Sequence, residues 1–428
     1  MNIRQFALVF LASLVFAANA WAVPAAPVAT EVSQPDGMSF TVRARGDEYA
    51  NWVETLDGHS VIKIGDTWYY AESDGVGGLR ASSIRVGSLN PVELQSIPLH
   101  LSPDPHPDAF LPVQVRKISR ADAKSGPGGV GALLTPHTQK VLTVRVNYSD
   151  ALISYSPASI LSLMYGATSS VKDFFLDNSY NRFTIAAAAE SYVTSNDGLV
   201  DIFRPVAHPN PGGNTAAAKA EARTVVGLTD SFVNYASFDT NGDGEVTADE
   251  LSIVIILAGY ETSYGGTGIA LTPGVWGHKS SFASDLSLDG VILSPYTMFG
   301  EAHGSVFNVK HQATIGIMCH ELGHLMLGLP DLYDIDDSNG GSEGIGDWGL
   351  MGGGSWNQVG AWSGDSPAHM SSWSKVATDF TLPQDIDVNQ NGISFAKADT
   401  NEVAKRIWID KYKVKESFLV ENRQKSGY

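Results

Sequence analysis

The sequence is 428 residues long and 43% hydrophobic, with 17 Phe, 15 Tyr and 9 Trp. A chain of this size and composition can build a sizeable core, divides into roughly two or three domains, and is not intrinsically disordered. Its 28 basic and 46 acidic residues give a formal net charge of −18. This charge argues against nucleic acid or an anionic membrane surface as a partner.

The first residues have the organisation of an export signal. Arg4 precedes an apolar stretch over residues 6–18, and small residues define two alternative cleavage sites, after Ala20 and after Ala22. The stretch is too short to span a bilayer, and no other segment approaches the roughly 20 apolar residues that a spanning helix needs. We therefore expect residues 1–22 to be a signal peptide, and the mature protein to be secreted and extracellular without stable membrane insertion.

Cys319 is the only cysteine, so no disulfide can form within the chain. Exported proteins usually have access to an oxidising environment, and here stability must come instead from packing and bound metals. We interpret Cys319 as a buried structural thiol rather than a metal ligand or a nucleophile.

The first predicted unit covers residues 23–135 and is mostly β. Short strands are indicated at residues 39–42, 60–63 and 67–70, with turn signals such as Asp57-Gly58 between them. A basic stretch at residues 116–120 leads into the run Gly-Pro-Gly-Gly at residues 126–129. The composition of this run predicts an exposed, flexible linker that is open to proteolysis.

From Val141 the pattern changes to alternating strands and helices, which predicts an α/β layer. Strands are expected at residues 141–146, 183–187 and 251–258, and helices at 171–176, at 215–238 with Asn214 as its cap, and at 312–327. The strand at 251–258 is a near-continuous apolar run, as is typical of a strand buried on both faces. After Pro383 the chain becomes polar and strand-like again. It ends at Tyr428 without a closing element, so we expect residues 383–428 to be the start of a truncated C-terminal β domain.

The helix expected at residues 312–327 contains His320-Glu321-Leu322-Gly323-His324, an H-E-x-x-H pattern. Residues i and i+4 share one helix face, so both imidazoles can reach one zinc ion. Glu321 lies beside them, where it can polarise a water molecule at the metal as a general base. The surrounding residues are apolar on all sides, so the helix is buried, and ionisable side chains in a core are costly unless paired or metal-bound.

A third zinc ligand is expected just after this helix. Gly328 allows the helix to end, and a proline prevents its resumption before Asp331. A helix, a glycine turn and a third ligand form the metzincin arrangement, in which Met351 is a candidate Met-turn residue. The glycine is displaced by one residue from the usual spacing, so the third ligand stays open between Asp331 and its rival Asp334. The gluzincin alternative, Glu343, is disfavoured because the surrounding glycines do not form a helix.

These residues resemble the immune inhibitor A family of bacterial secreted metallopeptidases. The specific part is His-Glu-Leu-Gly-His-Leu-Met-Leu-Gly-Leu-Pro-Asp-Leu-Tyr-Asp at residues 320–334, and further similarity lies at 34–37, 45–48, 169–175, 178–180, 346–351, 366–370 and 419–423. The resemblance implies an export signal, an inhibitory propeptide over residues 23–135, a zincin catalytic domain over residues 136–382 and C-terminal β domains. It also implies a mixed sheet and a buried active-site helix. A cysteine switch is excluded, because the only cysteine lies in the catalytic helix.

A second metal site is predicted at residues 239–250, which match every fixed position of an EF-hand calcium loop. Ca²⁺ prefers oxygen ligands, and the candidates here are Asp239, Asn241, Asp243, Glu245 and Glu250. A strand is expected after this loop where a sensor EF-hand has a helix. We therefore interpret the loop as a structural clip and not as a calcium switch.

The leading hypothesis is a secreted zinc-dependent endopeptidase that is made as a zymogen, with Zn²⁺ and Ca²⁺ as cofactors and extracellular proteins as substrates. Its own propeptide would be the inhibitor. The alternative is a catalytically silent secreted binding or adhesion protein that retains the zincin fold; the intact Glu321 favours the enzyme. Four further histidines could contact substrate, although a structural role fits each of them better: His278, His303, His311 and His369. Of these four, His278 is the strongest candidate for substrate contact.

Overall fold

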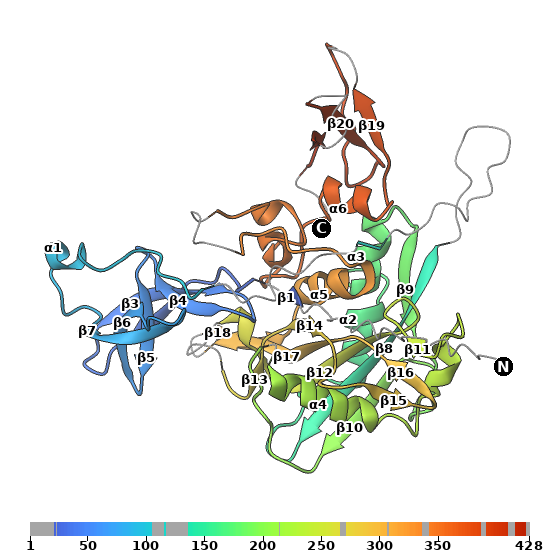
Figure 1. Cartoon of the computed structure of the whole chain (residues 1–428), viewed down its shortest axis with the longest axis horizontal. Coiled ribbons are helices and arrows are strands. Elements are labelled where there is room, and N and C mark those ends of the chain that lie inside the picture. Colours follow the sequence, from blue (N-terminus) through green and yellow to red (C-terminus); the bar gives the residue numbers. More distant parts are fainter. Residues whose placement is uncertain are drawn as a thin grey trace, which may run out of the picture.

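The structure, a computed structural model, describes residues 21–22, 24–104, 115–116, 136–213, 215–265, 271–305, 308–335, 342–386, 391–409 and 416–424. Figure 1 shows an N-terminal β unit, a central α/β part and a small C-terminal sheet. The prediction of a mixed α/β fold is therefore confirmed. Most of the expected signal peptide, the predicted linker at residues 126–129 and the predicted cap Asn214 lie outside the described residues.

The N-terminal unit is an antiparallel sheet whose described strands pair in chain order. These are β2 Thr30–Ser33, β3 Ser39–Gly46, β4 Asn51–Thr55, β5 Ser60–Ile64, β6 Thr67–Ser73 and β7 Leu79–Arg85, followed by the short helix α1 Pro91–Leu94. Burial alternates along β2, which is typical of a sheet with one packed face. The unit has its own small core, which includes Val42, Val53 and Trp68.

The central part is built on a mixed sheet. Its main path among the described residues is β1 Trp21–Ala22, β14 His278–Ser280, β17 Tyr296–Ser305, β12 Ser252–Glu261, β8 His137–Tyr148 and β10 Leu199–Arg204, with β9 Phe183–Ala187, β13 Gly274–Val275 and β18 Asn308–Gln312 attached to it. Strand β12 lies between β8 and β17, parallel to both, and residues 252–259 are all buried. This confirms the strand predicted at residues 251–258.

Helices cover both faces of this sheet (Figure 1). One face carries α2 Pro157–Tyr165, α3 Val171–Asn178 and α5 Ile315–Leu327, and the other carries α4 Ala216–Gly227. The remaining helical elements are α6 Ser372–Ala377 and the short 3₁₀ turns η3 Tyr235–Phe238, η4 Thr262–Tyr264, η6 Gly346–Trp348 and η7 Gly353–Trp356. Alternate residues of β12 separate the two cores: Val254 packs with α5, whereas Ile255 packs with α4. No helix in the described part of the chain is long and apolar enough to cross a membrane.

One predicted helix is too long. The segment 215–238 is helical only over α4, because Thr215 is the N-cap, with its hydroxyl accepting from the Ala218 N–H, and the helix ends at Gly227. The apolar periodicity continues because Tyr235 and Phe238 fill the same core as α4 from a 3₁₀ turn. The helix predicted from residue 312 begins instead at Ile315, since the preceding residues pair with β17 as β18.

Two small sheets complete the structure. One of them contains β11 Glu245–Val246, β16 Val291–Leu293 and β15 Leu286–Leu288, and β11 lies within the predicted calcium loop. The other lies after α6 and contains β19 Pro383–Ile386, β20 Ala404–Trp408 and β21 Ser417–Val420. Strands therefore follow the central part, in agreement with the polar, strand-like pattern after Pro383.

Candidate active site

The site is built on α5, which is buried along its whole length. The helix ends at Gly328, whose backbone is left-handed at φ 61° and ψ 27°. Glycine adopts this conformation without steric cost. The N–H groups of Gly328 and Leu329 donate to the carbonyls of His324 and Gly323 at 3.0 and 3.2 Å. This closure turns the chain back and brings Asp331 beside the helix it has just left.

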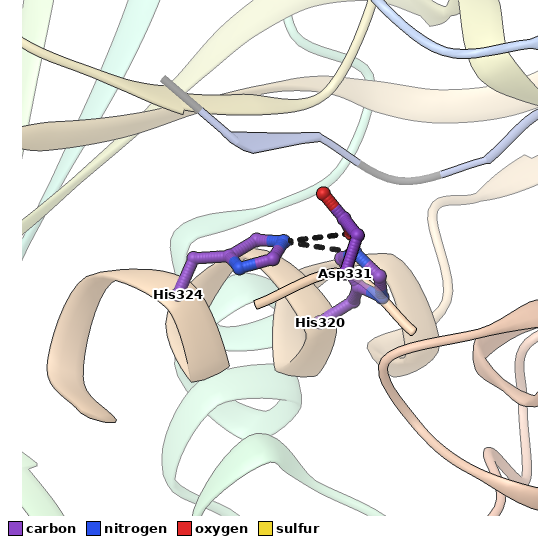
Figure 2. A group of neighbouring side chains, drawn as sticks. All are labelled: His320, His324 and Asp331. Atoms are coloured by element: carbon purple, nitrogen blue, oxygen red, sulfur yellow. Dashed lines mark hydrogen bonds and ion pairs between the residues drawn. The ribbon is translucent and has the colours of Figure 1, made fainter. Parts of the chain in front are cut away.

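His320, His324 and Asp331 converge on one point. Within the described residues, they are the one group of three or more His, Cys, Asp or Glu side chains whose ligand atoms all lie within 4.8 Å of one another. The two imidazole Nε2 atoms are 3.0 Å apart, and Asp331 Oδ1 lies 3.1 Å from His320 Nε2 and 3.2 Å from His324 Nε2. Figure 2 shows the three side chains turned toward one another, two from the helix and one from the segment after it.

The backbone orients both imidazoles toward this point. His320 Nδ1 lies 2.8 Å from the Leu350 carbonyl oxygen, and His324 Nδ1 lies 2.5 Å from that of Leu329. A carbonyl only accepts, so each Nδ1 carries the proton and each Nε2 presents a lone pair. Two lone pairs and a carboxylate directed at one buried point form an arrangement that could hold a cation.

The donor set fits zinc. A tetrahedral zinc ion with bonds of about 2.0–2.1 Å holds its ligand atoms about 3.3 Å apart, close to the 3.0–3.2 Å observed. Burial acts to raise the pKa of Asp331, but His324 and His320 outweigh it, so this pKa lies below its ordinary value. Burial in turn lowers the pKa of His324. For Asp331 and His324 the site therefore favours the forms that bind a metal, a carboxylate and a neutral imidazole.

Glu321 is fully buried beside this group but is not a member of it. Burial raises the pKa of its carboxyl well above the ordinary value, and the charges of Asp331 and Glu261 add to the effect. The backbone N–H and the charge of Lys279 act in the opposite direction. A buried carboxyl group with a raised pKa has the properties of a general acid–base catalyst.

The other candidate residues for this site are Met351, Asp334 and Glu343. Met351 is buried, and its Sδ lies 3.0 Å from where a Cβ on Gly323 would stand, so its thioether packs against the helix between the two histidines. Asp334 is outside the cluster and accepts a hydrogen bond from the Ser342 N–H at 2.9 Å. Glu343 is exposed.

Two buried ionisable residues near Glu321 were missed by sequence reasoning. Glu261, at the end of β12, accepts from the N–H groups of Gly277 and Gly300 at 2.6 and 3.1 Å, and burial raises its pKa to about 7. Lys279 lies on β14, and burial lowers its pKa to about 8 while the charge of Glu321 opposes this shift. A glutamate closing an otherwise apolar strand was a usable signal for Glu261. Nothing local marks Lys279.

The N-terminal segment lies along strand β14 of the central sheet. Strand β1 pairs antiparallel with β14, with Trp21 opposite Lys279 and Ala22 opposite His278. The Ala26 N–H then donates to the Ser263 carbonyl at 2.7 Å. In Figure 2 a pale blue ribbon from the N-terminal part of the chain crosses the view above the three side chains. The chain therefore places its own extended segment on the edge strand beside the metal centre.

The remaining histidines have structural surroundings. His278 is fully buried, its Nδ1 lies 2.7 Å from the Trp276 carbonyl oxygen, and burial lowers its pKa to about 4. His303 stacks on Tyr264 at 4.6 Å between ring centroids. Cys319 is buried in the core around α5, and burial raises the pKa of its thiol well above the ordinary value. Its surroundings are those of a structural thiol.

The predicted calcium loop is closed by its own side chains. Asp239 Oδ1 accepts from the Gly242 N–H at 2.7 Å, its Oδ2 accepts from the Gly244 N–H at 3.0 Å, and Glu250 Oε1 accepts from the Thr240 N–H at 2.8 Å. Among the described residues, the side chains of this loop are not part of the cluster formed by His320, His324 and Asp331. It leads directly into β12, so the helix of a sensor EF-hand is replaced by the central strand.

A family model described as the catalytic domain of immune inhibitor A peptidase M6 matches residues 143–382. No curated protein matches the sequence. The matched region is more than half of the chain and includes α5, the glycine turn, Asp331 and Met351. A match of this extent over the residues that build the site establishes that the chain belongs to the immune inhibitor A family of M6 metallopeptidases.

Proposed function

We propose that the chain is a zinc-dependent endopeptidase that is secreted, made as a zymogen, and hydrolyses peptide bonds of extracellular proteins. Family membership makes it a peptidase and implies a metal. The observation that supports zinc is the convergence of two Nε2 atoms and one carboxylate oxygen, 3.0–3.2 Å apart, at a buried point. Both imidazoles are already oriented for this purpose by backbone carbonyls.

In this proposal His320, His324 and Asp331 would hold the ion. The ion would act as a Lewis acid and would lower the pKa of a bound water molecule to about 7. Glu321 accepts the proton of the attacking water and passes it to the leaving amine. Met351 packs against α5, and the carbonyl of the preceding residue, Leu350, orients His320. Asp331 is favoured over Asp334 as the third zinc ligand because the Asp334 carboxylate already accepts a hydrogen bond from the Ser342 N–H.

A casein or gelatin zymogram tests the function. The processed enzyme should clear the gel, lose this activity with a zinc chelator and regain it when zinc is restored. A binding or adhesion protein that retains the fold would bind zinc and leave the protein in the gel intact. That outcome would favour the alternative.

We also propose that residues 23–135 are a propeptide, residues 136–382 the catalytic domain and residues 383–428 the start of a β domain. Cleavage should fall between Arg116 and His137, because both limits are anchored. The Arg116 N–H donates to the Leu327 carbonyl at 2.8 Å and its guanidinium lies 3.0 Å from Asp249, while His137 begins β8. N-terminal sequencing of the active secreted enzyme should give a start between these residues. An active species that begins near Val23 would contradict the proposal.

Ca²⁺ should protect the catalytic domain against heat and self-digestion through Asp239, Asn241, Asp243, Glu245 and Glu250. A ligand at a hundredfold excess over Kd stabilises the folded state by about 2.7 kcal/mol, which corresponds to roughly 5–10 °C in Tm for a domain of this size.

The measurement is a melting curve with and without calcium, on chains that carry Glu321→Ala to prevent self-digestion. Asp243→Ala should remove the calcium-dependent shift, and Asp230→Ala, an exposed aspartate outside the loop, should keep it. If Asp243→Ala melts like its parent under both conditions, the calcium site lies elsewhere.

A further inference from the structure

Residues 348–351 contact the candidate zinc site through two successive backbone carbonyls. The Leu350 carbonyl oxygen lies 2.8 Å from His320 Nδ1. The carbonyl of the next residue accepts a hydrogen bond from the N–H of Leu332 at 2.7 Å, and Leu332 directly follows Asp331 in the chain. Groups that orient metal ligands from outside the ligand shell affect how tightly the metal is held. The position of these four residues therefore matters for both His320 and Asp331.

The Leu350 backbone rests in turn on His369. The Leu350 N–H donates to the His369 carbonyl at 3.4 Å. His369 is buried, and its Nδ1 lies 3.3 Å from Lys375 Nζ on α6. The N–H of Met370 donates to the side chain of Asn178, at the end of α3, at 2.7 Å. The backbone that orients the first zinc ligand is therefore supported by a second segment, which is itself attached to two helices.

Arg423 binds both of these segments at once. Its Nη1 donates to the Trp348 and His369 carbonyls at 2.5 and 3.1 Å, and its Nη2 donates to the Met370 carbonyl at 2.7 Å. Its Nε donates to Glu421 Oε1 at 2.8 Å. A planar guanidinium can donate in all of these directions together, whereas the ammonium group of a lysine cannot form such a fork. One side chain thus joins three carbonyls of two segments.

Arg423 belongs to the C-terminal part of the chain, after the residues 143–382 that match the family model. It closely follows β21, which pairs with β20 and contacts α6 (Figure 1). The preceding residue, Asn422, is held by the same part of the chain. Its side chain donates to the Phe395 carbonyl at 3.0 Å, and its own carbonyl accepts from the Ala398 N–H at 2.8 Å. The C-terminal part therefore fixes where the guanidinium lies.

We propose that Arg423 is a positioning residue of the zinc site. By holding the Trp348 and His369 carbonyls, it keeps the Leu350 carbonyl at His320. The proposal rests on the proposed zinc-dependent function and adds to it a residue from outside the matched domain. Arg423 acts only through the backbone, because its hydrogen bonds in the described part of the chain go to three carbonyls and to Glu421. The segment after residue 382 is then a working part of the enzyme.

Hydrogen exchange in the metal-free chain tests the contact itself, independently of the function. Every chain carries Glu321→Ala to prevent self-digestion, and Arg423→Met removes the guanidinium while keeping a long side chain. The Leu350 N–H should exchange at least about tenfold faster in Arg423→Met than in the parent, the scale of one lost hydrogen bond to a charged group. A melting curve on the same samples confirms folding. If Arg423→Met is unfolded, Arg423→Lys replaces it, because lysine keeps the charge without the fork.

The matched control is Arg182→Met. The Arg182 side chain is 20% exposed, against 18% for Arg423. Its guanidinium donates to the Phe380 carbonyl and pairs with Glu402, so it also joins the central and C-terminal parts, but it does not bind residues 348–370. Arg182→Met should therefore lower the melting temperature and leave the exchange of the Leu350 N–H at the parent rate.

Metal binding tests the positioning role. The bound zinc is titrated with a competing chelator, and Arg423→Met should weaken zinc retention by about tenfold or more, the scale for residues that support a metal from outside its ligand shell. Arg182→Met should retain zinc like the parent. With Co²⁺ in place of zinc, the visible absorption reports the coordination geometry. It should change in Arg423→Met and not in Arg182→Met.

Each outcome separates the contact from the function. Unchanged exchange of the Leu350 N–H in Arg423→Met would overturn the contact. Faster exchange with zinc retention like that of the parent would overturn the positioning role. Equal loss of zinc in Arg423→Met and Arg182→Met would also overturn it, because the effect would then come from docking of the C-terminal part in general. A parent chain that binds no zinc, yet shows the difference in exchange, would contradict the proposed function and not the contact.

Discussion

Replacing Glu321 with alanine should remove proteolysis while leaving the fold and the metal centre nearly intact. Glu321 lies on α5 between the two histidines, yet its carboxylate is outside the cluster of ligand atoms. The change therefore removes the proposed proton acceptor without removing a ligand. It also removes a fully buried carboxyl group whose pKa is raised by burial, so the loss of its interaction with Lys279 is offset by the removal of a costly buried group.

The expected loss is about 10²–10⁴-fold in kcat, the scale of general acid–base catalysis. It is measured on the processed enzyme with a fluorogenic peptide, and zinc content is determined on the same sample. The matched control is Glu343→Ala, which removes the same charge from an exposed side chain. Glu343 is also the residue that a gluzincin would use, so near-wild-type activity of this variant excludes that arrangement. Near-full activity of a zinc-loaded Glu321→Ala enzyme would rule out the proposed mechanism.

Local sequence patterns were sufficient for the elements that carry the site. The apolar run at residues 251–258 lies in the central strand because both of its faces are covered, and the strand predicted at 183–187 is β9. Gly328 ends α5 in the left-handed conformation that only a glycine adopts without strain. In each case the determining interactions lie within a few residues, so periodicity and a single glycine contain the information.

Contacts between distant segments could not be predicted in this way. The carbonyl that orients His320 belongs to Leu350, 30 residues away. Glu261 and Lys279 approach Glu321 from two separate strands, β12 and β14. The end of an apolar strand marks Glu261, but nothing in its immediate sequence marks Lys279. The helix predicted over 215–238 was too long for a related reason, because residues of a 3₁₀ turn bury the same face as α4. Burial by tertiary packing was mistaken for helical periodicity.

The third zinc ligand could be predicted only in part from the local sequence. The spacing after His324 left Asp331 and Asp334 as rivals, because it differs by one residue from the metzincin pattern. The extra residue is absorbed within the helix, which continues to Leu327 before the turn at Gly328. The turn then directs Asp331 to the two imidazoles, whereas Asp334 faces the Ser342 N–H.

Asp331→Ala should therefore weaken zinc binding far more than Asp334→Ala. Asp331 contributes the only carboxylate oxygen to the cluster found in the described residues, at 3.1 and 3.2 Å from the two Nε2 atoms. Its removal leaves two imidazoles as ligands, and the loss of affinity should exceed the roughly 10–100-fold seen when a supporting residue outside the ligand shell is changed. Asp334→Ala removes a hydrogen bond to the backbone of a neighbouring segment and should leave zinc affinity near that of the parent. Chelator competition on chains that carry Glu321→Ala, without self-digestion, measures both affinities directly. If Asp334→Ala loses zinc and Asp331→Ala retains it, the ligand is Asp334, and the segment after Gly328 must rearrange when the metal binds.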